Sequence, residues 1–294
     1  TITHFLLNKI PQIKRAIAKG KKVALFLDEA SMIPMHMWPL LGVLKFIGVE
    51  FYIFGDFAGQ FAPIMLNDPK NKWSTMDSSD FMHDLCNGLK IEFKKYRRGD
   101  DFEHFKLVGS IYPQKMNLSE ALIIAREAYP IRPEIIPSTT LCVSNLFRKK
   151  INASYNKAEY QKSHQLDGAF LEYNCSDKNK GQSMYIWPGL ILQAYTTEHK
   201  AKQYNIKNGL FYEILEITEN IITFKNSKDE LMQLSNSEIP QKMLLCYAYT
   251  YHKSQARTIQ GSLRLAQTNH KNFSQRHLIV GLGRAPKGID LQVA

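Results

Sequence analysis

Apolar positions in the first part of the chain alternate between helical spacing and short uninterrupted runs. Residues 5–18 carry apolar side chains at roughly helical intervals, which predicts a helix that ends at Gly20. The runs at 23–27 and 49–54 are typical of buried strands, and residues 37–47 between them predict a second helix. Buried strands that alternate with helices predict a parallel α/β sheet, in which chemistry lies at the carboxyl ends of the strands.

The pattern changes twice in the rest of the chain. Residues 140–143 predict a third buried strand, followed by a helix through Asn152. Between about 165 and 240, short β-type runs are separated by polar turns, among them the tight-turn pair Asn208 and Gly209. This alternation of short β-type runs and polar turns predicts a small β-barrel inserted into an α/β domain. The α/β pattern then returns with predicted strands at 244–251 and 277–282.

Composition narrows the class of protein. The chain has 294 residues, enough for roughly two domains, and its formal net charge of +11 favours a polyanionic partner, most simply nucleic acid. General solubility is the alternative explanation of the charge. The four cysteines form no CxxC pair, which excludes a zinc ribbon and suits a reducing compartment. No apolar run approaches the roughly 20 residues of a membrane span, and no signal peptide is visible. We expect a soluble intracellular protein without a membrane partner, and its compartment (nucleus, cytoplasm, or a viral or phage setting) stays open.

Two acidic motifs follow consecutive predicted strands. The first strand runs into DEASM at 28–32. Hydrolysis of ATP needs one carboxylate to hold Mg²⁺ and a second to orient or deprotonate water, and Asp28 and Glu29 could divide these tasks. The second strand ends in GDFAGQ at 55–60, where Gln60 could respond to a γ-phosphate. The alternatives are a solvated turn for the first motif and, for the second, a Gly-rich loop in which Asp56 caps a turn.

Two basic motifs lie near the C-terminus. HKSQ at 252–255, followed by Thr258, gathers hydroxyl, amide and ammonium donors that suit phosphate oxygens. A helix start with Ser254 as its N-cap is the alternative. The predicted strand at 277–282 leads to Arg284, which could stabilise the charge of phosphoryl transfer, or else is a lone surface arginine.

The order of these motifs resembles superfamily 1 DNA helicases. DEAS, GD…Q, YRR at 96–98, HKSQ…T and an apolar segment ending in Arg-Ala follow one another as in the 5′-to-3′ branch that includes the RecD, Dda and Pif-type helicases. TITHFL at 1–6 and residues 141–152 resemble further segments of that branch, and the β-rich insert resembles its SH3-like subdomain. The resemblance spans essentially the whole chain.

The resemblance implies an α/β fold of two RecA-like P-loop NTPase-type domains, the first one incomplete, with an SH3-like β-barrel insertion in the second. It places a partial first RecA-like domain, lacking the P-loop, at 1–90. The second RecA-like domain would occupy 91–164 and 241–294, and the insertion 165–240.

The resemblance also assigns roles to residues. Asp28 would bind Mg²⁺ through water, Glu29 would activate the attacking water, and Gln60 would sense the γ-phosphate of ATP. Arg97 and Arg284 would contact that phosphate from the second domain. Five residues would couple single-stranded DNA to the nucleotide cleft: His252, Lys253, Ser254, Gln255 and Thr258.

Some features depart from the family pattern. Three residues, not two, separate Asp56 from Gln60, while Ala256 and Gly283 replace a usual glycine and a usual serine. No G-x-x-x-x-G-K-[ST] motif occurs in the sequence. In the family that P-loop lies upstream of the point where this chain starts, so we expect these residues alone not to hydrolyse ATP.

The expected function is that of an ATP-dependent 5′-to-3′ DNA helicase or translocase core in replication, recombination or repair. It would act on single-stranded DNA and on forked or tailed duplexes. The alternatives are a non-catalytic DNA-binding or scaffold protein derived from a helicase, and a RecD-like subunit of a nuclease complex. Replication or nuclease proteins are candidate partners.

Overall fold

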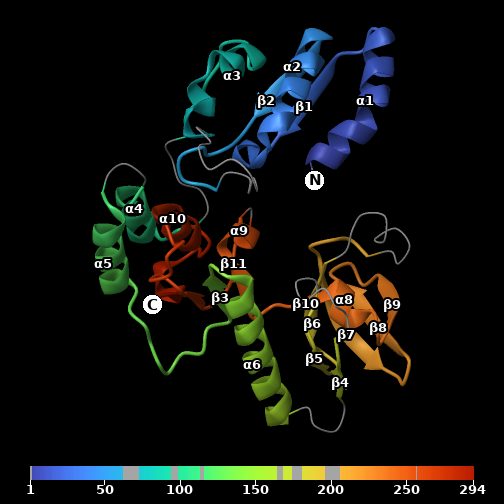
Figure 1. The fold of residues 1–294 in the computed structure, drawn as a ribbon, viewed down its shortest axis with the longest axis vertical. Helices are drawn as coiled ribbons and strands as arrows, with labels where there is room; N and C mark the ends of the chain where they lie inside the picture. Colours follow the sequence, from blue (N-terminus) through green and yellow to red (C-terminus); the bar gives the residue numbers. More distant parts are fainter. Residues whose placement is uncertain are drawn as a thin grey trace. The chain divides into compact units, whose positions relative to one another are not determined.

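The computed structural model describes residues 2–61, 73–93, 99–112, 116–163, 168–173, 181–195, 206–255 and 257–294. The chain forms two compact units (Figure 1). The first comprises Thr1–Ile124, Gln255–Thr258 and Ser274–Gly288, and the second comprises Ala125–Ser254, Ile259–Phe273 and Ile289–Ala294. Each unit therefore joins segments that are far apart in the sequence. The four-part domain division proposed from the sequence stays a prediction.

Two parallel strands form the sheet of the first unit. β1 (Val23–Leu27) pairs with β2 (Val49–Ile53), with Val23 opposite Val49 and Leu27 opposite Ile53. α1 (Ile2–Ala18) precedes β1, and α2 (Trp38–Phe46) lies in the crossover between the strands. All four elements lie close to the predicted ranges, and the parallel pairing confirms the α/β arrangement of this part.

The strands of this sheet bury only one face. Leu25, Leu27, Val49 and Phe51 share a core with residues of α1, α2 and α3 (Asp80–Leu85). On the opposite face, the rings of Phe26 and Tyr52 stack with centroids 4.7 Å apart and are 69% and 48% exposed. The apolar runs predicted strands of the fully buried kind, which is wrong for the described structure. Successive side chains point to opposite faces of a strand, and one of these faces is not packed.

One of the helices that follow this sheet lies where the sequence predicted a strand. α4 (Phe102–Ser110), α5 (Leu118–Ala128) and α10 (Gln275–Leu282) follow, and α10 occupies the segment predicted as a strand. Ser274 caps α10, with its hydroxyl 2.8 Å from Nδ1 of His277. Every residue at 277–282 is buried. A helix buried on all sides and a buried strand both give an uninterrupted apolar run, so the pattern could not distinguish them.

A four-stranded parallel sheet anchors the second unit. Its order is β11-β3-β12-β13, made of β3 (Thr139–Cys142), β11 (Ala248–Thr250), β12 (Leu263–Leu265) and β13 (Leu291–Val293). β3 confirms the predicted third strand. α6 (Asn145–Ser163) packs on this sheet and runs well past the predicted end at Asn152.

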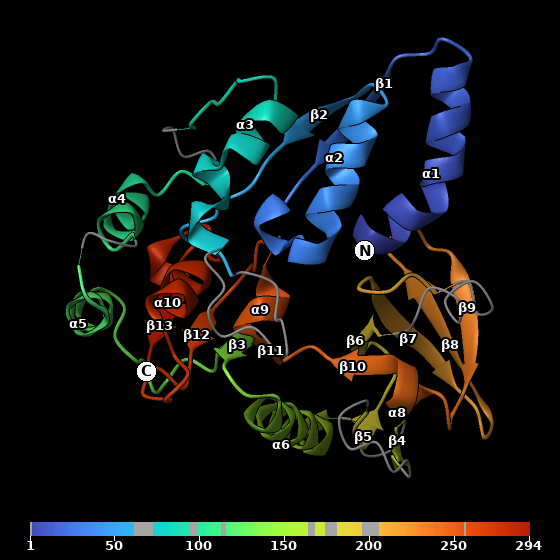
Figure 2. The same cartoon turned by 45° about the horizontal axis from the view of Figure 1, so that its top comes forward.

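The second unit also contains antiparallel β-structure, as the β-type runs predicted. A five-stranded sheet has the order β10-β6-β7-β8-β9, and its neighbouring strands are seen side by side in Figure 2. Tyr212 and Phe224 are almost fully buried in its core. Its strands are β6 (Ile191–Ala194), β7 (Phe211–Ile217), β8 (Ile221–Asn226), β9 (Leu231–Ser235) and β10 (Met243–Leu245). β4 (Ala169–Leu171) and β5 (Met184–Ile186) form a separate pair. The SH3-like character of this region stays a prediction.

The predicted strand at 244–251 is divided between the two sheets. β10 pairs antiparallel with β6, whereas β11 pairs parallel with β3. α8 (Ile239–Lys242) precedes β10, and α9 (Tyr251–Ser254) follows β11 directly. A continuous apolar run does not reveal which sheet will receive each part of it, because that choice depends on partner strands far away in the sequence.

Candidate functional site

The acidic motif after β1 forms a tight corner at the end of the parallel sheet. Glu29 adopts a left-handed conformation with φ of 53°, and its N–H donates to Oδ1 of Asp28 at 2.9 Å. The two strand ends remain bonded beyond the sheet: Phe54 N donates to Leu27 O and Ala30 N donates to Phe54 O, both at 2.8 Å. The DEAS and GD…Q motifs therefore lie at the same sheet edge, as parallel strands require. Asp28 is exposed and Glu29 is half-buried.

A glycine allows the two motifs to approach each other. A Cβ added at Gly55 would lie 3.1 Å from the backbone nitrogens of both Ala30 and Ser31. Contacts that short are tighter than most side chains tolerate, so Gly55 lets the second loop run close beside the acidic corner.

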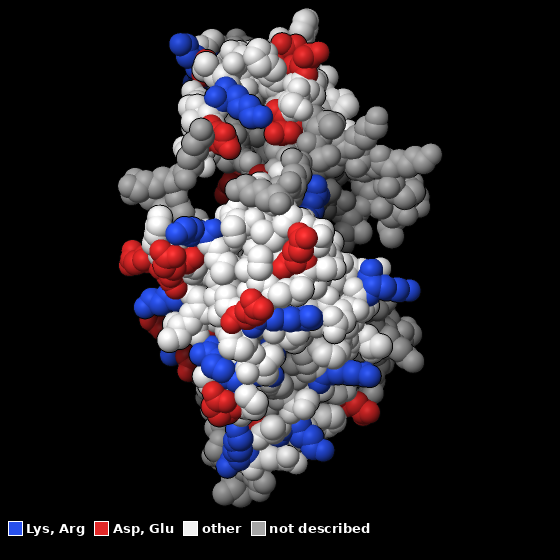
Figure 3. Space-filling model, turned by 90° about the vertical axis from the view of Figure 1, so that its left-hand side faces the viewer, with Lys and Arg blue, Asp and Glu red and all other residues white. Residues whose placement is uncertain are grey.

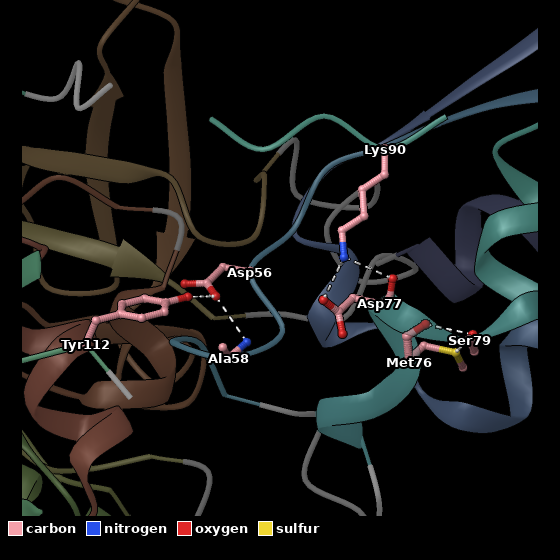
Figure 4. Close-up of polar contacts among 7 residues, drawn as sticks. All are labelled: Asp56, Ala58, Met76, Asp77, Ser79, Lys90 and Tyr112. Carbon is pink, nitrogen blue, oxygen red and sulfur yellow. Dashed lines mark hydrogen bonds and ion pairs between the residues drawn. The ribbon is translucent and has the colours of Figure 1, made fainter. Parts of the chain in front are cut away.

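Asp56 organises the loop that leads to Gln60. Its Oδ1 accepts hydrogen bonds from Ala58 N at 3.1 Å and from Gly59 N at 2.8 Å. The hydroxyl of Tyr112 donates to the same oxygen at 2.5 Å, and Figure 4 shows this ring pointing at the carboxylate. Asp56 therefore caps a turn, which was the alternative interpretation of this motif.

Gln60 is the point at which three sequence motifs meet. Ser31 Oγ of DEAS donates to Gln60 Oε1 at 3.4 Å. Gln255 Nε2 of HKSQ donates to the same oxygen at 3.5 Å, although the two residues are 195 positions apart. Both hydrogen bonds are long and therefore weak. They nevertheless bring residues of three separate motifs to one side-chain amide.

Arg284 and Arg97 are the two arginines predicted to contact the γ-phosphate. Arg284 is buried; its Nε donates to Val280 O at 3.0 Å and its Nη1 donates to Arg257 O at 3.3 Å. Arg257, which accepts from Arg284, lies two positions after Gln255, which donates to Gln60. The residues that Arg284 and Gln60 contact are therefore close together in the sequence. Arg97 lies outside the described residues.

The predicted DNA-binding residues are distributed between the two units. Gln255 and Thr258 belong to the first unit, whereas His252, Lys253 and Ser254 lie in α9 of the second. The ammonium of Lys253 is 4.6 Å from the ring centroid of Tyr195, a cation–π geometry. Ser254 Oγ donates to Tyr251 O at 2.7 Å, and burial lowers the pKa of His252.

Sequence reasoning missed several residues of these sites. Tyr112 binds Asp56, Arg276 Nη2 donates to Phe57 O at 3.3 Å, and the ring of His277 meets that of Phe61 with centroids 4.5 Å apart. In the second unit it missed Tyr195. None of these residues belongs to a motif, and each acquires its contact through folding, so the sequence carried no signal for them.

The acidic corner is suited to a magnesium ion that is shared with a ligand. Among the residues that the structure describes, no three or more His, Cys, Asp or Glu side chains gather as a metal site. Mg²⁺ usually takes one or two carboxylates together with water and substrate phosphates, so the exposed Asp28 beside Glu29 fits that mode.

The surface adds two findings. Figure 3 shows Lys and Arg interspersed with Asp and Glu on the face that it draws, and the described residues there form no extended basic patch. In the described part of the chain, no helix combines the length and the apolar character needed to span a membrane.

Comparison with solved structures identifies the fold. A structure of two coordinating Pif1 helicases unwinding forked duplex DNA has a TM-score of 0.65 and 18% identity, with 95% of this chain and 70% of that chain covered. The chain has the fold of a Pif1 helicase. Bacteroides Pif1 bound to single-stranded DNA gives a TM-score of 0.63 at 17% identity, covering 95% of this chain and 72% of that one. The same enzyme in complex with ADP-AlF3 and single-stranded DNA gives 0.61 at 14% identity, with the same coverage.

The Pif1 likeness confirms the predicted fold class. The parallel sheets match RecA-like helicase domains of Pif1, as the motif order had implied. No protein-family model matches the chain. No curated protein matches it either.

Proposed function

We propose that this protein is an ATP-dependent DNA helicase or translocase core that moves 5′-to-3′ on single-stranded DNA. The observation that carries the proposal is the convergence of Ser31 and Gln255 on the amide oxygen of Gln60. Coupling of ATP turnover to DNA movement requires contact between residues that face nucleotide and residues that face DNA. The likeness to Pif1 structures that hold single-stranded DNA and ADP-AlF3 supports it further.

The acidic corner would perform the hydrolysis. Asp28 would hold Mg²⁺ through water, and Glu29 would take the proton of the attacking water. The Mg²⁺ would neutralise phosphate charge when bound. Gln60 would sense the γ-phosphate, and Arg284 and Arg97 would stabilise the charge that develops on it. Asp28 is exposed and accepts the Glu29 N–H, whereas Glu29 is half-buried, so the two carboxylates have different environments.

The HKSQ segment would contact DNA. His252, Lys253 and Ser254 come first in this segment, and Gln255 and Thr258 follow. Together these residues would connect the phosphodiester backbone with Gln60. Contacts to phosphates carry no base information, so we expect little sequence preference on single-stranded, forked or tailed DNA. Its role in replication, recombination or repair, and any replication or nuclease partner, belong to the same proposal.

The test is phosphate release by the full-length gene product, with and without single-stranded DNA. We expect DNA-stimulated hydrolysis that Glu29→Gln reduces by about 10²–10⁴-fold, the usual effect of losing a general base. ATP binding should survive, since glutamine keeps the size and hydrogen bonding of the side chain.

Two controls sharpen this test. The 294 residues alone contain no P-loop motif and should bind DNA without hydrolysing ATP. Glu50→Gln, an exposed carboxylate on β2, should leave turnover unchanged. DNA binding with no hydrolysis by the full-length product would favour the non-catalytic DNA-binding alternative, and turnover of Glu29→Gln within a few-fold of the unaltered protein would remove Glu29 from the mechanism.

A further inference from the structure

The loop from Gly55 to Gln60 has an anchor that no motif contains. Three residues separate Asp56 from Gln60, and the hydroxyl of Tyr112 donates a hydrogen bond to Asp56. We propose that Tyr112 is a positioning residue, which acts through Asp56 to hold Gln60 where it senses the γ-phosphate. This inference rests on the proposed function of Gln60.

One carboxylate oxygen of Asp56 accepts several of the hydrogen bonds that hold this loop. Oδ1 accepts from two successive amides inside the loop, those of Ala58 and Gly59, and from Tyr112 outside it. Figure 4 shows the bonds from Ala58 and Tyr112. Hydrogen bonds to an ionised acceptor are shorter and stronger than neutral ones. The turn that ends at Gln60 is thereby tied to a residue 56 positions away.

Gly59 provides the room for this arrangement. A Cβ at position 59 would lie 2.5 Å from Asp56 Oδ2 and 2.8 Å from Cε2 of Tyr112. Both distances are shorter than real side chains show, so any other residue would push the tyrosine ring and the carboxylate apart. The segment between Asp56 and Gln60 therefore contains, at position 59, the residue type that lets Tyr112 reach Asp56.

Tyr112 is itself held in place by the start of α10. Gln275 Nε2 donates to Ile111 O at 2.9 Å and to Met116 O at 3.0 Å, on either side of Tyr112. The next residue, Arg276, donates to Phe57 O inside the loop. The same helix therefore fixes both the tyrosine and the loop, and Arg284 follows at its far end.

The donor role of Tyr112 does not change with pH in the working range. Burial, and then the hydrogen bond to Asp56, raise the pKa of its phenol well above the usual value. The hydroxyl stays protonated and the Asp56 carboxylate remains its acceptor. The phenol therefore keeps its proton for the hydrogen bond to Asp56 over that range.

The decisive variants are Tyr112→Phe, Asp56→Ala and the double variant, compared with Tyr52→Phe. Tyr112→Phe removes only the hydroxyl, and Tyr52 is a half-exposed tyrosine of the same unit whose ring stacks on Phe26. The full-length gene product is assayed for kcat and for KM of ATP at saturating single-stranded DNA. Amide hydrogen exchange of the 55–61 segment is measured in parallel.

We expect Tyr112→Phe to lower kcat by about tenfold to a hundredfold, the scale of a small misplacement of a catalytic group, with KM changed by less than about twofold. Exchange of the 55–61 amides should accelerate. In the Asp56→Ala background the same change should have no further effect on kcat, because Tyr112 acts through Asp56. Tyr52→Phe should resemble the unaltered protein in both measurements.

Three results would overturn the inference. Unchanged exchange in Tyr112→Phe would show that the tyrosine does not hold the loop. Faster exchange with unchanged kcat would make the contact structural only, and a further loss of kcat in the double variant would mean that Tyr112 acts by another route. If the unaltered protein shows no DNA-stimulated hydrolysis, the proposed function fails and this role fails with it, while the exchange data still show whether the loop contact exists.

Discussion

Asp56 and Lys253 illustrate how single residues gain their roles from their neighbours. Asp56 belongs to the GD…Q motif, in which Gln60 was the predicted nucleotide contact, and its Oδ1 accepts three hydrogen bonds from protein groups. Lys253 was a generic cation of a donor-rich motif, and folding brings it over the ring of Tyr195. An aromatic ring beside an ammonium is a common surface for single-stranded nucleic acid, since bases stack on the one and phosphates pair with the other.

Replacement of Lys253 tests this role at the level of one residue. Lys253→Ala should weaken binding of single-stranded DNA and make its salt dependence shallower by roughly 0.7 in the log–log slope, the value for one phosphate contact. Fluorescence anisotropy over a range of salt concentrations measures both effects. The control is Lys157→Ala, which removes an exposed lysine of α6. Equal slopes for the two variants would show that Lys253 does not contact a phosphate.

At the scale of elements, α6 connects the four-stranded parallel sheet of the second unit with the β4-β5 pair. Its buried Asn152 donates to Ala248 O at 3.3 Å and accepts from Ala248 N at 2.8 Å, next to the parallel sheet. One turn later Asn156 makes the same pair of bonds with Tyr185 of β5, at 2.9 and 2.8 Å. Two asparagines on one helix face thus satisfy backbone groups of strands that belong to different sheets.

Removal of one of these amides should destabilise the unit. Asn152→Ala leaves the Ala248 N–H and C=O buried without that partner, which typically costs about 1–3 kcal/mol for each such group. Chemical denaturation should therefore show a lower free energy of unfolding. Ser154→Ala, on the exposed side of the same helix, should change it little. Equal stability of the two variants would mean that α6 does not connect the sheets in this way.

At the scale of the whole molecule, we expect His104 and His252 to couple stability to pH. Burial is the main cause that lowers the pKa of His104, against the opposing effect of Asp101 and of the backbone at Leu282 and Ala285. Burial also lowers the pKa of His252 in the other unit. An unfolded histidine titrates near pH 6.5, so below that pH the unfolded chain binds more protons than the folded one.

Stability should consequently be fully present above about pH 6.5 and should fall as the pH drops toward the lowered folded pKa values. Melting temperatures between pH 5 and 8 measure this slope. His104→Gln removes one titrating group and should flatten the slope, whereas His36→Gln, at an exposed position, should not. A slope that His104→Gln leaves unchanged would assign the pH dependence to other groups.

The sequence by itself determined the local elements and the order of the motifs. β1, β2 and β3 were predicted within a residue or so, because short apolar runs bounded by polar turns are a local property. That parallel strands end at one edge was also enough to predict that DEAS and GD…Q lie together.

Only the tertiary structure decided what depends on distant partners. The buried segment 277–282 is a helix and not the predicted strand, and the choice of partner strand divided 244–251 between two sheets. The hydrogen bond between Tyr112 and Asp56 joins residues 56 positions apart, and the one between Gln255 and Gln60 joins residues 195 positions apart. Hydrophobic periodicity reports which residues neighbour each other along one helix or strand. Contacts across such separations arise only when packing brings the segments together, and no local pattern encodes them.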